Sequence, residues 1–324
     1  MKKEYYSTFL PGLEEPVAAM LRHTGGISVT RMLPGAVTYR SVREPHAACV
    51  QRTFQVLAEM KPEKNLDAAL RRLSGTDMWL DRFEFESIAG LRFRIVTAVD
   101  GQPCAANMRY VSMLEKNICE QTGMQVSRER PQVELWVNLR QEALYFLWRM
   151  DKKEGQKNAD PLRRDLCEAI ASLGRVQGGQ AAVLGLTGIN LPEALRAQGA
   201  AGVNAVLADH VKGPAADALR KVVRIQSGSP GCCGLTDHSQ NAVFVCLAPK
   251  GGYSIQEEAL RSTLREAARI LKPDGRLVVF YPKALERTFR RLGEQERLCE
   301  YRVTVSGEEC RLEAFNITDG TDQA

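Results

Sequence analysis

The first 150 residues alternate between strand-like and helix-like hydrophobic patterns. Leu13, Val17 and Leu21 recur at the spacing of one helix face, and Pro34-Gly35 separates two short apolar runs as a turn would. We therefore expect strands at residues 5–9, 27–32, 36–40, 83–87, 91–99, 133–138 and 144–149. Helices are expected at residues 13–22, 45–59, 65–73 and 108–121. This order predicts two small α+β units, one after the other.

The pattern changes after residues 151–160, a polar stretch that has the composition of a linker. Helices are then expected at residues 162–173, 192–198, 215–222 and 256–271, and strands at 181–184, 203–208, 242–246 and 276–281. Regular alternation of this kind favours a doubly wound, mostly parallel sheet. The last two apolar runs, at 298–305 and 310–316, predict an antiparallel hairpin at the edge of that sheet.

Length and composition narrow the class of protein. A chain of 324 residues has room for about two domains, and 44% hydrophobic with 26% charged residues is typical of globular proteins and excludes a disordered chain. The net charge of +5 is compatible with a nucleic-acid partner and equally with an ordinary mixed surface. No run of about 18 apolar residues could span a membrane, and the first residues lack the apolar core of a signal peptide. We expect a cytoplasmic protein.

The nine cysteines follow no framework spacing and include no CxxC pair. This distribution predicts reduced thiols and no structural metal site. The adjacent Cys232 and Cys233 leave metal binding or oxidation open as an alternative.

Several motifs, taken together, resemble the THUMP-containing RNA methyltransferases. Residues 6–15 are similar to the "T-x-P-G-L-E" start of that family, residues 35–39 to its "G-x-V-x-F", and residues 130–135 to its "R-P-D-V" strand. Residues 268–276 resemble the "R-x-L-K-P-G-G" turn of class I methyltransferases. The order of these motifs and the spacing between them agree with the family pattern over nearly the whole chain.

The resemblance implies a fold, a partner and an activity. It implies an α+β ferredoxin-like unit at residues 1–52, a THUMP RNA-binding domain at 53–150, the linker at 151–160, and a class I (Rossmann-like) methyltransferase domain at 161–324. The implied partner is a structured RNA, tRNA or rRNA, read by its shape and its single-stranded end. The implied activity is S-adenosylmethionine-dependent methyl transfer, at guanine N2 if the protein is active.

The cofactor motif departs from the family pattern. Where the family has "D-P-x-C-G-S-G", this chain has Gly185 in place of the acid, keeps Gly188, and carries Ile189 and Leu191 where only hydrogens usually fit. Asp209 follows the second strand of this half and could accept hydrogen bonds from ribose hydroxyls. Its alternative role is an ordinary helix N-cap or surface acid.

The base-holding loop of the family, "N/D-P-P-Y", is also altered. Cys246 or Leu247 occupies the amide position, Pro249 is the one proline that remains, and Lys250 falls where the aromatic should be. Chemistry on a flipped-out base needs such a holder. Cys246 could instead be a nucleophile, although a cysteine that ends an apolar strand is more often buried and inert.

An RNA-binding face is expected in the first half. Arg92 and Arg94 alternate along one predicted strand and therefore share a face. The other candidates are Arg109, Lys116, Arg128 and Arg130. The alternative is a solvated face of mixed charge.

Two functions therefore stay open. One is an RNA methyltransferase with a divergent cofactor site, and the other is a catalytically inactive relative that binds RNA and keeps its Rossmann-like half as a scaffold. A nicotinamide-dependent enzyme is disfavoured because the chain lacks a GxGxxG turn.

Overall fold

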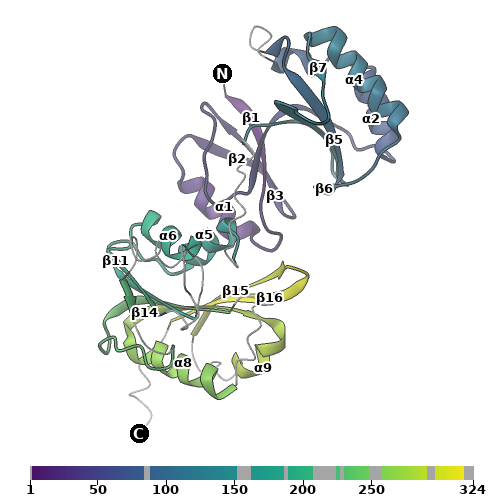
Figure 1. Cartoon of the computed structure of the whole chain (residues 1–324). Coiled ribbons are helices and arrows are strands. Elements are labelled where there is room, and N and C mark those ends of the chain that lie inside the picture. The colour runs from purple at the N-terminus through teal and green to yellow at the C-terminus, as the bar shows by residue number, and fades with distance from the viewer. Residues whose placement is uncertain are drawn as a thin grey trace.

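The computed structural model describes residues 2–83, 88–151, 162–185, 189–206, 224–226, 230–247, 257–289 and 296–316. These residues form two sheets, one built from residues 3–149 and the other from residues 180–316. In Figure 1 the two sheets lie toward opposite ends of the molecule, with helices α1, α5 and α6 between them. Within the described residues, no helix is both long enough and apolar enough to cross a membrane.

The first sheet joins the two expected α+β units into one. Its strands are β1 (Lys3–Thr8), β2 (Ile27–Leu33), β3 (Ala36–Ser41), β4 (Arg52–Met60), β5 (Arg92–Val99), β6 (Gln102–Pro103), β7 (Gln125–Val126), β8 (Val133–Leu139) and β9 (Leu144–Arg149). Their order is β2-β3-β1-β4-β9-β8-β5-β6, with β7 paired to β5. The helices of this half are α1 (Glu14–His23), α2 (Leu66–Ser74), the 3-10 turn η1 (Leu80–Arg82) and α4 (Met108–Thr122). Strand β4 connects the two units because it pairs with β1 on one side and with β9 on the other.

The helix expected at residues 45–59 is wrong, because most of this segment is strand β4. The six residues 53–58 are all buried, since the strand is central and covered on both faces. Polar and apolar residues alternate only from Thr53 to Val56, and a bulge between Val56 and Ala58 then makes three apolar residues consecutive, which breaks the period of two that identifies a strand. Most of the strand expected at 83–87 lies outside the described residues.

The second sheet confirms the doubly wound arrangement and the hairpin. Its strands are β10 (Gln180–Leu184), β11 (Gly202–Val206), β12 (Arg224–Gln226), β13 (Gln240–Cys246), β14 (Leu271–Pro282), β15 (Glu296–Val305) and β16 (Glu308–Asn316). Its helices are α5 (Arg164–Leu173), α6 (Asn190–Ala197), α8 (Glu257–Ile270) and α9 (Glu286–Phe289), with the 3-10 turn η2 (Lys283–Leu285). The order is β12-β11-β10-β13-β14-β16-β15, and β16 runs antiparallel to both its neighbours. The strand order reverses between β10 and β13, which is where open sheets of this type bind ligands, at the carboxyl ends of the strands.

The two halves pack against each other through one core. A single apolar cluster contains residues of β1, β3 and α1 together with residues of α5, α6 and the second sheet. The backbone N–H of Leu10 donates to the Asp165 carboxylate at 3.0 Å, and Gly12 lies directly against the carbonyl of Arg302 in β15. The position of the first sheet relative to the second therefore follows from packed contacts.

Gly12 gives a test of this junction. Gly12 and Gly26 both have left-handed backbones, at φ +96° and +84°, but a Cβ at Gly12 would collide with the Arg302 carbonyl whereas a Cβ at Gly26 meets nothing within 4 Å. We expect Gly26→Ala to cost roughly 1–2 kcal/mol of stability from backbone strain alone. Gly12→Ala should cost about 3 kcal/mol or more, because strain and collision add. Melting temperatures check this, and equal losses for the two variants would contradict the packed junction.

Candidate functional site

Gly185 directly follows β10, at the carboxyl edge where the strand order reverses. Its φ is +81°, a conformation that glycine adopts without strain. A Cβ built there would lie 3.7 Å from the Cys246 carbonyl and 3.8 Å from Leu247, which are ordinary contact distances. Glycine is therefore favoured here by the backbone conformation and not by a lack of space. The N–H of Gly185 donates to the Val206 carbonyl at 3.3 Å, which ties this edge to β11.

The two branched residues of the altered cofactor motif pack into the core. Leu191 is fully buried in the cluster that α5 and α6 share, and Ile189 is half-buried against the same cluster. Between them, the Asn190 amide donates to the Leu162 carbonyl at 2.8 Å and anchors the start of α6. Both apolar side chains are thus accounted for by packing. The other two predicted cofactor residues, Gly188 and Asp209, lie outside the described residues.

Cys246 ends β13 as a fully buried side chain. Burial raises the pKa of its thiol, which disfavours the thiolate that nucleophilic attack requires. Leu247, the next residue, is buried as well. The geometry favours an inert Cys246. Pro249, the other residue predicted for the base-holding loop, lies outside the described residues.

The six predicted RNA-binding residues fall into two groups. Three have acidic partners: Arg94 pairs with Glu134, Arg128 with Glu115 at 3.5 Å, and Lys116 with Glu120 at 3.7 Å. The other three are exposed and have no acidic group within ion-pair distance in the described part of the chain, namely Arg92, Arg109 and Arg130. The unpaired three are the better placed to contact phosphates.

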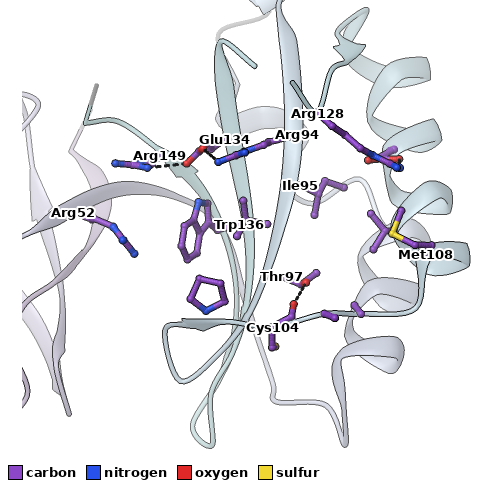
Figure 2. A pocket seen from close by; sticks show the side chains of 16 residues that line it. Arg52, Arg94, Ile95, Thr97, Cys104, Met108, Arg128, Glu134, Trp136 and Arg149 are labelled. Atoms are coloured by element: carbon purple, nitrogen blue, oxygen red, sulfur yellow. Dashed lines mark hydrogen bonds and ion pairs between the residues drawn. The ribbon is translucent and has the colours of Figure 1, made fainter. Parts of the chain in front are cut away.

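A cavity of about 820 Å³ lies beside β5, and Arg94 and Arg128 are part of its wall (Figure 2). Its wall also contains Arg52, Trp136 and Arg149, which the sequence patterns did not single out. The Glu134 carboxylate lies between Arg94 and Arg149 and pairs with both, at 2.9 Å in the case of Arg149. The guanidinium of Arg52 lies 5.5 Å from the centre of the Trp136 ring.

A second cavity, of about 870 Å³, lies where the first sheet meets α5 and α6. It shares Arg52 and Arg149 with the first cavity. Its wall also includes Arg163 and Asn190, the first residue of α6. The two cavities thus have two arginines in common, and their walls extend from β5 to the helix that follows the Gly185 turn.

Comparison with known proteins shows a shared fold. The sequence matches no protein-family model and no curated protein. The structure is similar to TrmN from Thermus thermophilus, with 17% identity and a TM-score of 0.74 over 97% of this chain and 99% of that one. It is also similar to a possible methylase from Clostridium difficile 630 (12%, TM-score 0.72, 97% and 98% covered) and to SMU.472 in complex with SAH (10%, TM-score 0.66, 97% and 98% covered). This chain therefore has the mixed α/β fold of these proteins from one end to the other.

The burial of the cysteines predicts their reactivity. Cys104 and Cys232 are exposed, whereas Cys246 is buried, and a buried thiol of raised pKa reacts slowly. We expect rapid reaction of the native protein with a thiol reagent at Cys104 and Cys232, and protection of Cys246 until unfolding. Cys246→Ser should leave the fast phase unchanged, while Cys104→Ser and Cys232→Ser should each remove part of it. Rapid labelling of Cys246 in peptide maps would show that it is accessible after all.

Proposed function

We propose that this protein is an S-adenosylmethionine-dependent RNA methyltransferase that acts on a tRNA or rRNA and holds it with the first half of the chain. The supporting observation is the similarity in fold to TrmN, which covers 97% of this chain and 99% of that one and so includes both sheets. The resemblance of the motifs to THUMP-containing enzymes points to the same class independently of the fold.

The cofactor would bind at the carboxyl edge of the second sheet. S-adenosylmethionine supplies an electrophilic methyl group when bound. Gly185 suits such a site, because its left-handed turn lets backbone groups approach a ligand closely. Ile189 and Leu191 pack into the core, so their side chains are not an objection to binding, whereas the acid of the family pattern is still replaced by Gly185. Gly188 and Asp209 are the further residues proposed to contact the cofactor.

RNA binding without methyl transfer is the second candidate. It is favoured by the end of β13, where Cys246 and Leu247 are both apolar and buried. Neither side chain could accept a hydrogen bond from the amine of a target guanine as an amide or carboxylate would. In this case the second half would serve as a scaffold.

Cofactor binding and methyl transfer separate the two candidates. S-adenosylhomocysteine at about 100 times its dissociation constant should stabilise the protein by roughly 2.7 kcal/mol, which is visible as a rise in melting temperature. Gly185→Ala should weaken this rise. Gly178→Ala is the matched control, because Gly178 also has a left-handed backbone (φ +71°) but precedes β10 instead of following it.

Label transferred from S-adenosylmethionine to total RNA would establish catalysis. RNA binding with neither a shift nor transfer would establish the second candidate.

The contact with RNA should depend on Arg92, Arg109 and Arg130, which are exposed and have no ion pair among the described residues. Each phosphate contact to a single strand contributes about 0.7 to the slope of log affinity against log salt. We expect the variant Arg92→Gln/Arg109→Gln/Arg130→Gln to lower that slope by about 2. The control changes Arg22, Arg175 and Arg287, which are also exposed and belong to none of the elements that neighbour β5. Equal slopes for both triple variants would exclude this face as the RNA contact.

A further inference from the structure

Cys232 and Cys233 are the only adjacent cysteines among the nine, and the proposed function uses neither of them. They belong to residues 231–237, called here the strap, which run alongside helix α8 before the chain enters β13. The carbonyl of Gly231 accepts a hydrogen bond from the Ser262 hydroxyl at 3.4 Å, and a Cβ at Gly231 would collide with that side chain. The strap is therefore packed closely on α8.

The two thiols of the strap have different environments. Cys232 is exposed and lies in the wall of a cavity of about 640 Å³, whereas Cys233 is fully buried. Cys233 donates to Glu266 twice, from its backbone N–H at 2.8 Å and from its thiol at 3.1 Å. Burial raises the pKa of the Cys233 thiol and so keeps it protonated. A small reagent in solution thus meets Cys232 first.

Glu266 is itself held in place by Arg269, which follows it on the same helix. Arg269 donates to both carboxylate oxygens of Glu266, at 2.7 and 2.8 Å, and these hydrogen bonds lower the pKa of Glu266 to about 2. Arg269 also donates to the Leu235 carbonyl at 2.7 Å and pairs with Asp237. These two side chains of α8, called here the latch, therefore hold the strap at Cys233, Leu235 and Asp237.

A disulfide between the two cysteines is incompatible with the latched strap. Oxidation removes the thiol hydrogen that Cys233 donates to Glu266, and the sulfur has to turn toward that of Cys232. Adjacent Cα atoms are about 3.8 Å apart, which is less than the roughly 4.4–6.8 Å usual for disulfides, so the backbone between them is strained. Gly234, with φ +69° and open space around it, gives the chain the freedom to turn at this point. Strained disulfides are readily reduced, so the change would be reversible.

We infer that Cys232 and Cys233 form a reversible oxidation site for hydrogen peroxide, and that their disulfide releases the strap from the latch. The sulfur of Cys232 attacks the peroxide, the O–O bond breaks, and water leaves with the thiol proton of Cys232, which becomes a sulfenic acid. The sulfur of Cys233 then attacks that of Cys232, and the hydroxyl leaves as a second water with the proton of Cys233. The two thiols lose two electrons, and the peroxide gains them. Neither RNA nor S-adenosylmethionine takes part, so the site is independent of the proposed function.

Peptide mapping of the full-length protein tests the disulfide. The reduced protein is treated with hydrogen peroxide, unfolded and labelled with iodoacetamide. The peptide that contains Cys232 and Cys233 should have lost two hydrogens and take up no label, and dithiothreitol should restore labelling of both. Cys233→Ser should leave Cys232 as a sulfenic acid, which dimedone traps. Cys104, which is exposed and has no adjacent cysteine, shows the oxidation of a single accessible thiol for comparison.

Glu266→Gln tests the latch. The loss of charge weakens the bonds to Cys233 and Arg269, so we expect the disulfide to form about tenfold faster, the usual effect of weakening one charged hydrogen bond. Glu258→Gln is the matched control, because Glu258 also lies on α8 but bonds to Arg265, at 3.3 Å, instead of to the strap. Melting temperatures show whether both variants are folded. Hydrogen exchange of the wild-type protein needs no variant, and residues 231–237 should exchange faster after oxidation.

The site and the latch fail on different results. Oxidation of Cys232 to a sulfinic acid while Cys233 still takes up label would overturn the site, as would a disulfide from Cys232 to any other cysteine or no reaction at either thiol. Equal rates for Glu266→Gln and Glu258→Gln would exclude Glu266 as the latch. Unchanged hydrogen exchange of the strap after oxidation would show that the disulfide forms without release.

Discussion

A buried carboxylate holds the two halves of this molecule together. Asp165 is 2% exposed, accepts the N–H of Leu10, and is held by the guanidinium of Arg163 at 3.0 and 2.6 Å. A buried charge that lost either partner would destabilise the fold strongly. Separation of the loop after β1 from the start of α5 would therefore have a high free-energy cost. The cavities beside β5 and α6 are positioned relative to the Gly185 turn through this junction and the core around it.

In the first sheet, too, acidic side chains neutralise the charge of neighbouring arginines. Glu134 compensates Arg94 and Arg149 across three neighbouring strands, and Asp151 adds a second acid at Arg149. The two acids offset part of the repulsion among the guanidinium groups of this sheet, although the charge of Arg149 still lowers the pKa of Arg52. Arg52 lies at the end of this group, where its guanidinium is over the Trp136 ring and the charges of Asp151 and Glu134 act on it from a greater distance.

Much of the fold could be predicted from local patterns. The alternation after residue 162 and the hairpin at 298–316 followed from periodicity and turn residues, and both are present. Strand β4 was not recognised, because a bulge between Val56 and Ala58 interrupts the short alternation of residues 53–56 that would identify a strand. Trp136 and Arg149 were missed for a different reason, since their proximity to Arg94 depends on which strands pair. Of the residues predicted to contact the cofactor, Gly185 alone could be compared, as Gly188 and Asp209 lie outside the described residues.

Strand β4 has a consequence for how this chain could have been assembled. Its hydrogen bonds to β1 and to β9 make it an interior strand of a nine-stranded sheet, although it begins where one α+β unit would be expected to give way to the next. A chain divided at that point would leave β1 and β4 each with an unpaired edge, and exposed edges invite association with other strands. Exchange of either unit between proteins by recombination would therefore have to carry the other with it. The first 150 residues thus form one structural unit, although their pattern predicts two.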